Sequence, residues 1–199
     1  MSPLPVADMQ GLYAEIDRAI TAFKLATGLR CRSQCGQCCP EASIAVTMVE
    51  MLPAAAALLA SGDIQHWLAK LADAGRTCVA FSPDPLPETG GHCRIYEHRP
   101  VVCRLFGFAA IRNRLGKLEL STCRPIRQDF PEAVSRAEAL LAKDIPAPLL
   151  TGYSQRLFGL DPTAHPMPIN QALARAIQRC GLFSTLDTPP GAEPLPRAG

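Results

Sequence analysis

Hydrophobic and polar positions along this chain alternate mostly with helical periodicity. Between residues 8 and 27, apolar side chains recur every three or four positions, as on one face of an amphipathic helix. Asp8 is the expected N-cap of this helix, and Gly28 is the expected stop. The pattern therefore predicts a mainly α-helical fold with minor β structure, with further helices over residues 47–60, 63–75, 130–143 and 169–180.

Local signals define some of the connections between these helices. Thr47 and Glu50 have the spacing of a capping box, which would open the second helix. Pro53 then requires an adjusted first turn or a kink. Residues 43–47 form a candidate extended piece, and residues 113–116 have the composition of a turn between two short segments that are either extended or helical.

Prolines and glycines mark the segments in which we expect no regular element. Residues 82–91 form a proline-rich loop, and residues 145–168 form a proline-punctuated connection before the last helix. We expect one domain over residues 1–186, with its motif core at 31–124, followed by a disordered tail at 187–199.

Composition and charge narrow the class of protein. The chain has 199 residues, of which 48% are hydrophobic and 19% charged, as in ordinary globular proteins. The net charge of +2 is too small to indicate nucleic-acid binding. The N-terminus lacks the pattern of a signal peptide, and the most apolar run, 51–60, is far shorter than the roughly 20 residues that span a bilayer. We expect a cytoplasmic protein without a membrane or nucleic-acid partner, and a protein partner is left open.

Cysteines are the most informative residues of the chain. Eight of the nine lie between positions 31 and 123, and four of these fall within nine residues. Thiolates this close repel one another unless a cation lies among them, and a reducing cytoplasm disfavours disulfides. The sequence therefore predicts a metal centre, with the candidate ligands Cys31, Cys35, Cys38, Cys39, Cys78, Cys93, Cys103 and Cys123. The ninth cysteine, Cys180, has the apolar neighbours of a buried thiol.

The context of these cysteines resembles a known family. The run C-x3-C-x2-C-C, followed by Cys93-x-Ile-Tyr-x-x-Arg-Pro-x-x-Cys103-Arg, is similar to the CxxCxxCC family, described as a zinc- or iron-chelating domain. The resemblance covers roughly residues 31 to 124. One departure is that three residues separate Cys31 from Cys35, where the family often has two. Similar domains occur in flagellin lysine N-methylases, which implies iron–sulfur chemistry, but the resemblance implies no single activity.

Two kinds of metal fit this set of cysteines. Zinc takes four tetrahedral ligands, and iron–sulfur clusters take thiolates at their irons. Eight cysteines suffice for two four-thiolate sites, or for one cluster with structural thiols left over. The compressed spacing favours an iron–sulfur cluster over Zn²⁺, and [4Fe–4S] is the favoured type of cluster. Two neighbouring residues can hardly both ligate one small ion with ideal geometry. Whether Cys38 and Cys39 both bind metal therefore indicates whether there is one centre or two.

Residues around the cysteines are candidates for tuning the centre. A four-thiolate centre carries a formal charge of about −2, which arginines would offset while donating hydrogen bonds to sulfur. Arg99 and Arg104 lie within the motif and are the predicted cofactor-binding arginines, with Tyr96 as a wall of the site. His92 and His98 flank Cys93 and are alternative ligands.

Three functional hypotheses follow. The first is a metal-binding protein with an electron-transfer, metal-handling or structural role. The second is a metalloenzyme, either an oxidoreductase or an S-adenosylmethionine-dependent modification enzyme, which needs an open coordination position and a pocket. The third is an interaction module that zinc stabilises. The spacing C-x3-C-x2-C also occurs in radical S-adenosylmethionine enzymes, but Gln37 replaces their usual aromatic residue and no βα pattern follows.

Overall fold

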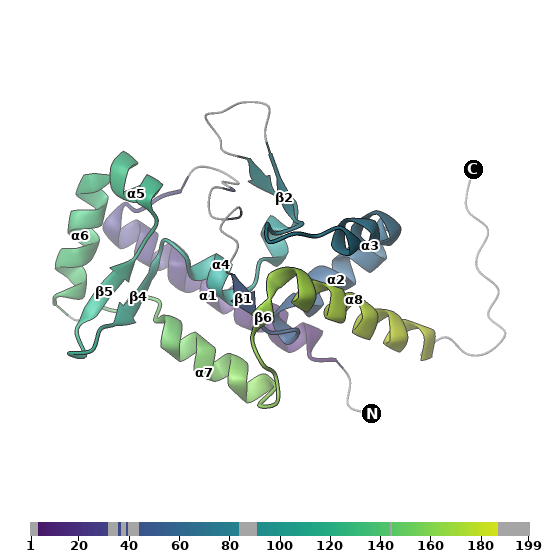
Figure 1. Cartoon of the computed structure of the whole chain (residues 1–199). Helices are drawn as coiled ribbons and strands as arrows, with labels where there is room; N and C mark the ends of the chain where they lie inside the picture. Colours follow the sequence, from purple (N-terminus) through teal and green to yellow (C-terminus); the bar gives the residue numbers. More distant parts are fainter. Residues whose placement is uncertain are drawn as a thin grey trace.

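The computed structural model of the chain describes residues 4–31, 36, 39, 44–83, 91–143 and 145–186. It is mostly helical with short two-stranded sheets, which confirms the predicted fold class (Figure 1). The predicted disordered tail lies outside the described residues, as do Cys35, Cys38 and most of the proline-rich loop. No helix in the described ranges is both long enough and apolar enough to cross a membrane.

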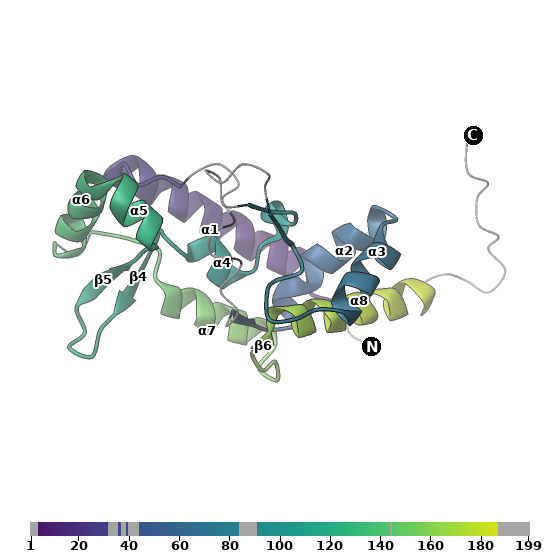
Figure 2. The same cartoon turned by 45° about the horizontal axis from the view of Figure 1, so that its top comes forward.

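The first helix, α1 (Val6–Thr27), confirms the strongest periodic signal of the sequence. It begins after Pro5 rather than at Asp8, so the N-cap prediction was wrong. Asp8 lies instead in the first turn, where a negative charge favours the helix dipole. Gly28 ends the helix with a left-handed conformation, φ 77°, and donates its N–H to the Lys24 carbonyl at 2.8 Å. Helix α1 contacts α2 and α6, which lie at opposite ends of the molecule (Figures 1 and 2).

One half of the molecule packs around the start of α1. The predicted second helix forms as a 3-10 turn, η1 (Val49–Met51), followed by α2 (Leu52–Ala60). This turn places Pro53 in the first turn of α2, which confirms the expected adjustment. Helix α2 packs on α8, and α3 contacts both. Strand β1 pairs antiparallel with β6. The bounds of the remaining elements here are α3 Ile64–Ala72, α8 Ile169–Leu186, β1 Ala45–Val46 and β6 Met167–Pro168.

The other half carries most of the predicted motif. Strands β2 and β3 pair antiparallel, and β4 and β5 form a hairpin whose turn contains residues 113–116, as predicted. The β5 strand contacts α6, and α7 contacts α4 and β4. The bounds are β2 Phe81–Ser82, β3 His92–Cys93, η2 Tyr96–His98, α4 Val101–Leu105, β4 Ala109–Arg112, β5 Leu118–Ser121, α5 Arg124–Asp129, α6 Pro131–Leu141 and α7 Leu150–Leu160.

The largest departure from the sequence-based prediction is α7. We expected a proline-punctuated connection over 145–168, yet an 11-residue helix forms there. Pro148 precedes this helix and Pro162 follows it, so the prolines flank the helix rather than prevent it. None of the residues of α7 is buried, which explains its weak hydrophobic signal. The last helix also continues beyond Cys180 to Leu186.

A buried carboxylate connects three elements of the fold. Glu50 is only 4% exposed, and its side chain accepts hydrogen bonds from the Thr47 backbone N–H at 2.7 Å and the Thr47 hydroxyl at 2.9 Å. Its other oxygen accepts from the Val101 N–H at the start of α4, at 3.2 Å. The Glu50 backbone carbonyl accepts from the Tyr13 hydroxyl of α1 at 2.5 Å. The expected capping-box contact therefore forms and also fixes α4, which carries Cys103.

Glu50 predicts a pH dependence of stability. Burial raises the pKa of its carboxyl group, and the hydrogen bonds from Thr47 and Val101 oppose this shift. Because the pKa is higher in the folded chain than in the unfolded chain, Glu50 contributes most stability below the unfolded-state pKa. That contribution is lost as the pH rises through the folded-state pKa. Urea denaturation at several pH values measures the free energy of unfolding of the wild type and of Glu50→Gln. We expect the difference, wild type minus variant, to decrease as the pH rises. A difference that does not change with pH contradicts this.

Candidate metal centre

The described cysteines of the motif come from separate elements of the fold. Two are buried, Cys39 and Cys78, and the other four are partly buried. Cys31 follows α1, and Cys39 ends the first cysteine run. Cys78 precedes β2 and Cys93 lies in β3. Cys103 lies in α4, and Cys123 is the N-cap of α5.

Direct backbone contact joins the first cysteine run to Gly91, the residue before β3. The Gly36 N–H donates to the Gly91 carbonyl at 2.9 Å, and the Cys39 N–H donates to the Gly36 carbonyl at 2.8 Å. Gly91 lies two residues before Cys93. A Cβ atom on Gly36 would lie 2.9 Å from the Gly91 carbonyl carbon and from the His92 nitrogen. Only glycine fits this approach, which brings residues of the first run beside the strand of Cys93.

The close approach at Gly36 gives a testable prediction. Gly36→Ala places a methyl group against the backbone of Gly91 and His92, so the two segments must separate. We expect metal affinity to fall by roughly tenfold or more, as measured by competition with a chelator. Gly159→Ala in α7 is the matched control, because no atom lies within 4 Å of a Cβ placed there. Equal metal affinity in the two variants contradicts the prediction.

Cys78 and Cys93 belong to one small antiparallel unit. Strand β2 pairs with β3 so that Phe81 lies opposite Cys93, and the Phe81 N–H donates to the Cys78 carbonyl at 3.0 Å. The Arg94 N–H donates to the Ala80 carbonyl at 2.8 Å. The segment of Cys78 and the segment of Cys93 are therefore held together by backbone hydrogen bonds, although 14 residues separate them in the chain.

Asn170, at the start of α8, holds the segment of Cys78 from the other side. Its side-chain oxygen accepts from the Val79 N–H at 3.0 Å. Its amide group donates to the Thr77 carbonyl at 2.8 Å and to the Gly75 carbonyl at 3.2 Å. One side chain thus contacts the backbone on both sides of Cys78. Sequence analysis missed this residue, because an asparagine about 90 positions away carries no local signal.

Replacing Asn170 tests whether this anchor matters for the centre. Asn170→Ala leaves the backbone around Cys78 without three hydrogen bonds, so we expect metal affinity to fall by roughly tenfold in chelator competition. Asn113→Ala is the matched control, because Asn113 accepts hydrogen bonds from the Leu115 and Lys117 N–H groups in the β4–β5 turn. If both variants lose metal equally, Asn170 has no specific role in positioning Cys78.

Arginines of the motif brace the segment around Cys103. Arg99 lies over the Tyr96 ring, 3.5 Å from its centroid, and donates to the Cys103 carbonyl at 3.4 Å. Arg104 donates to the Arg99 carbonyl at 2.8 Å, to the Glu97 carbonyl and to the Asp17 carboxylate at 2.6 Å. The described contacts of Arg104 therefore fix backbone and α1. Hydrogen bonding of either guanidinium to sulfur stays a prediction.

Cys103 also lies in the electrostatic environment of Tyr13. Burial, and then the charge of Glu50, raises the pKa of Tyr13 well above its usual range, and Cys103 adds to the increase. The Arg104 guanidinium, 4.3 Å from the centroid of the Tyr13 ring, opposes it. Tyr13 therefore stays protonated and donates its hydroxyl hydrogen to the Glu50 carbonyl. Through this hydrogen bond and Arg104, α1 supports the segment that carries Cys103.

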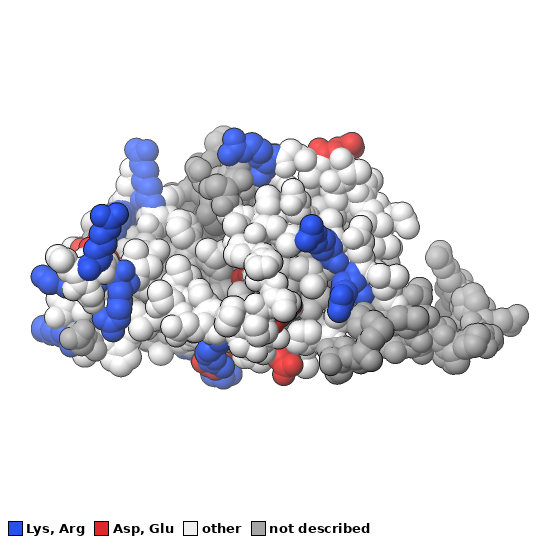
Figure 3. Space-filling model, turned by 60° about the horizontal axis from the view of Figure 1, so that its bottom comes forward, with Lys and Arg blue, Asp and Glu red and all other residues white. Residues whose placement is uncertain are grey.

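Positive charge gathers at the end of the molecule beyond Cys123. Residues 107–143 include seven Lys or Arg residues and four Asp or Glu residues. Figure 3 shows blue side chains over this end, where β4, β5, α5 and α6 lie. An anionic centre bound by Cys123 would lie beside this excess of positive charge, which would lower the electrostatic cost of gathering thiolates.

The ligand set itself remains a prediction. Within the described ranges, no three side chains of His, Cys, Asp or Glu form a group that could hold a metal ion. Cys35 and Cys38 lie outside those ranges. His92 pairs with Ser82 across β2 and β3, and His98 ends η2. The donors available are soft thiols, which suit zinc or iron. The chemistry of the donors and the Gly36–Gly91 contact therefore fit such a metal.

The fold is helical and carries its described cysteines on several segments that are distant in the sequence. Residues 30–124 match the family model CxxCxxCC, described as a putative zinc- or iron-chelating domain. This match covers nearly half of the chain and confirms the resemblance seen in the sequence. No curated protein and no solved structure matches the chain.

Proposed function

We propose that this chain binds an iron–sulfur cluster, first of all [4Fe–4S], and that it serves electron transfer or metal handling in a reducing compartment. Zinc is the alternative occupant. The ligands come from the eight clustered cysteines, Cys31, Cys35, Cys38, Cys39, Cys78, Cys93, Cys103 and Cys123. The observation that carries the proposal is the backbone contact between Gly36 and Gly91, which joins the first cysteine run to the strand of Cys93.

The protein contributes a ligand frame that is already held in place by its own contacts. Asn170 fixes the backbone around Cys78, and the β2–β3 pair links that segment to Cys93. Glu50 and Arg104 hold the segment of Cys103 against α1. When bound, an iron–sulfur cluster would supply one-electron redox chemistry. Arg99 and Arg104 would offset its negative charge, and Tyr96 would wall the site.

We also propose that residues 1–186 fold as one domain rather than as a metal module with appendages. Helix α1 precedes the family segment, and α6 and α8 follow it. Helix α1 contacts α4 within the segment, and α8 contacts α2 and α3. The Asn170 side chain crosses from α8 to the segment of Cys78. These contacts support a single cooperative unit.

Anaerobic purification followed by iron, zinc and acid-labile sulfide analysis tests the nature of the centre. We expect stoichiometric iron with matching sulfide, and broad visible absorption that bleaches on reduction. Stoichiometric zinc without sulfide, from anaerobic cells grown with excess iron, would assign the chain to the zinc class. Neither metal at stoichiometric level would remove the basis of the proposal.

A further inference from the structure

One buried hydroxyl group beside the proposed ligands has no hydrogen-bond partner. Among the described residues, the Thr122 hydroxyl oxygen is the only buried side-chain oxygen or nitrogen in this state. Thr122 lies directly before Cys123, one of the proposed ligands. A buried hydroxyl group costs free energy unless a partner meets it, and buried polar groups are almost always paired. The Thr122 hydroxyl therefore points to a partner that the described residues do not provide.

The connection that holds Thr122 is fixed on both sides. Strand β5 ends at Ser121, and Cys123 is the N-cap of α5, so Thr122 joins the two elements. The Ser121 carbonyl accepts from the Gly107 N–H at 3.2 Å, and the Cys123 carbonyl accepts from the Arg127 N–H at 3.2 Å. The carbonyls on both sides therefore take their hydrogen bonds from other donors, and the hydroxyl group bonds to neither.

The segment of Cys103 packs against both elements that Thr122 joins. Gly107 lies four residues after Cys103 and has a left-handed φ of 98°. A Cβ atom there would lie 2.9 Å from the Cδ1 atom of Ile126 in α5, so the backbone approaches α5 closely. The Gly107 N–H also contacts Ser121 at the end of β5. The chain that follows Cys103 is thus held beside Thr122.

The segment of Cys31 reaches the other end of α5. Arg30 directly precedes Cys31, and its guanidinium lies over the ring of Phe130, 4.6 Å from the ring centroid. Phe130 is the C-cap of α5. Helix α1, which ends just before Arg30, also contacts α6, and both views show this end of α1 beside α6 (Figures 1 and 2). Three proposed ligands therefore lie on segments that begin α5 or pack against it, namely Cys31, Cys103 and Cys123.

We propose that the Thr122 hydroxyl group donates a hydrogen bond to a sulfur atom of the metal centre, an inference that rests on the proposed function. Adjacent Cα atoms are only about 3.8 Å apart, so a metal bound by Cys123 lies close to Thr122. Threonine has one O–H donor, and the sulfur atoms carry the negative charge of the centre. A hydrogen bond to an ionised acceptor is stronger than a neutral one, and it satisfies the buried hydroxyl group.

This hydrogen bond should raise the reduction potential of an iron–sulfur cluster. One-electron reduction adds negative charge to the centre, so a donor to sulfur stabilises the reduced form more than the oxidised form. Thr122→Val removes the donor and keeps the shape of the side chain. We expect its potential to be lower than that of the wild type by about tenfold in the equilibrium constant for reduction, or about 59 mV for one electron. Titration of the full-length, anaerobically purified protein with dithionite, followed by visible absorption, measures this potential.

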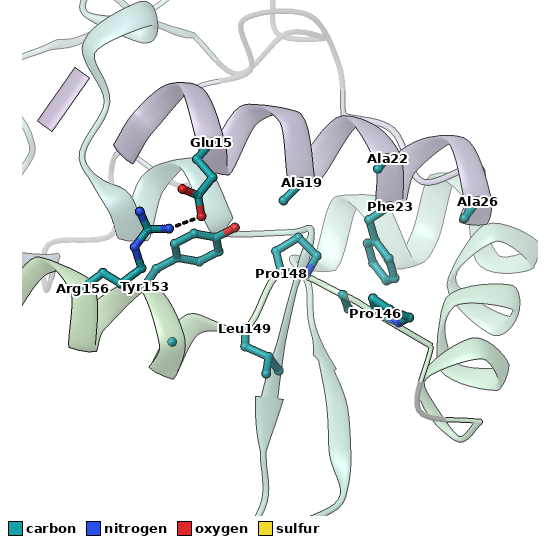
Figure 4. Close-up of a pocket in the computed structure, with 12 residues that line it drawn as sticks. Glu15, Ala19, Ala22, Phe23, Ala26, Pro146, Pro148, Leu149, Tyr153 and Arg156 are labelled. Carbon is teal, nitrogen blue, oxygen red and sulfur yellow. Dashed lines mark hydrogen bonds and ion pairs between the residues drawn. The ribbon is translucent and has the colours of Figure 1, made fainter. Parts of the chain in front are cut away.

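Two further variants separate the hydroxyl group from general effects of substitution. Thr122→Ser keeps the O–H donor, so its potential should stay close to that of the wild type. Thr151→Val is the matched control, because Thr151 is exposed in α7. Helix α7 borders a groove that no described cysteine lines, and Figure 4 shows Arg156 of α7 beside Glu15 of α1 there. We expect Thr151→Val to keep both its metal and the potential of the wild type.

A zinc centre would give the same comparison through affinity. The hydroxyl group would then stabilise a thiolate ligand of zinc, and competition with a chelator replaces the potential as the measurement. We expect Thr122→Val to bind zinc roughly tenfold more weakly than Thr122→Ser. Loss of metal from Thr122→Val alone, with full metal in Thr122→Ser, also supports the hydrogen bond.

Two results overturn the proposal. The first is a metal-loaded Thr122→Val protein with the potential or zinc affinity of the wild type, which would assign a buried water molecule as the partner of the hydroxyl group. The second is an equal change in Thr122→Val and Thr122→Ser, loss of metal from both included, which would assign the effect to side-chain shape. Metal content is measured on the same samples. A wild type without stoichiometric metal contradicts the proposed function as well, whereas the two results above contradict this inference alone.

Discussion

Arg104→Ala lowers the free energy of unfolding by roughly 3 kcal/mol, because it removes the donors that hold three segments together. The side chain is only 5% exposed and donates to two backbone carbonyls and to Asp17 of α1. It also stacks on the Tyr13 ring. Truncation removes these hydrogen bonds and leaves a void beside α4 where the buried guanidinium lay. Urea denaturation of the metal-loaded protein measures the loss.

Two comparisons define what the Arg104 result means. Arg112→Ala is the control, because Arg112 is exposed and donates one described hydrogen bond, to the Gly116 carbonyl. We expect its effect to stay within about 0.5 kcal/mol. Arg104→Lys keeps the charge but loses the planar set of donors, so it should recover little of the stability. An Arg104→Ala protein within about 1 kcal/mol of wild type contradicts this role.

Cys93→Ser abolishes stoichiometric metal binding. Cys93 lies in β3, which pairs with β2 beyond Cys78 and follows Gly91, the partner of Gly36 in the first cysteine run, so its thiol is central to the proposed ligand set. Serine keeps the size of the side chain but is a poor ligand for zinc or iron at neutral pH. Because metal binding and folding are coupled in such sites, we also expect a lower midpoint of thermal unfolding. Metal analysis after anaerobic purification gives the result.

Cys180→Ser is the matched control for the cysteine substitutions. Cys180 is buried in α8, and burial raises the pKa of its thiol, as expected of a core thiol. We expect this variant to keep its full metal content with a small loss of stability. A protein that retains metal as Cys93→Ser and loses it as Cys180→Ser would reverse the assignment of the ligand set.

The sequence predicted those parts of the fold whose signals are local. The periodicity of α1 and the stop at Gly28 depend on neighbouring residues, and both are confirmed. The spacing of Thr47 and Glu50 correctly indicated their contact. Helix α7 was missed, because its helical state depends on contacts with α4 and β4 rather than on a buried stripe of its own.

In the candidate metal centre too, local features could be predicted from the sequence and long-range contacts could not. The number and spacing of the cysteines can be read directly from the sequence, so the resemblance to the family and the metal-binding class could be predicted. The residues that position them could not, because Asn170 acts over about 90 positions of sequence. The partner of Gly36, the Gly91 carbonyl, is known only from the structure. A glycine within a cysteine run was the one available signal of a close backbone approach.

X-ray absorption spectroscopy of the anaerobically purified protein, at the iron and zinc edges, tests the central claim most directly. Ligation by the clustered cysteines predicts a first shell of sulfur atoms at about 2.3 Å around the metal that is present in stoichiometric amount. A first shell of nitrogen and oxygen atoms at about 2.0–2.2 Å would contradict the account, because the metal would then lie away from the thiols.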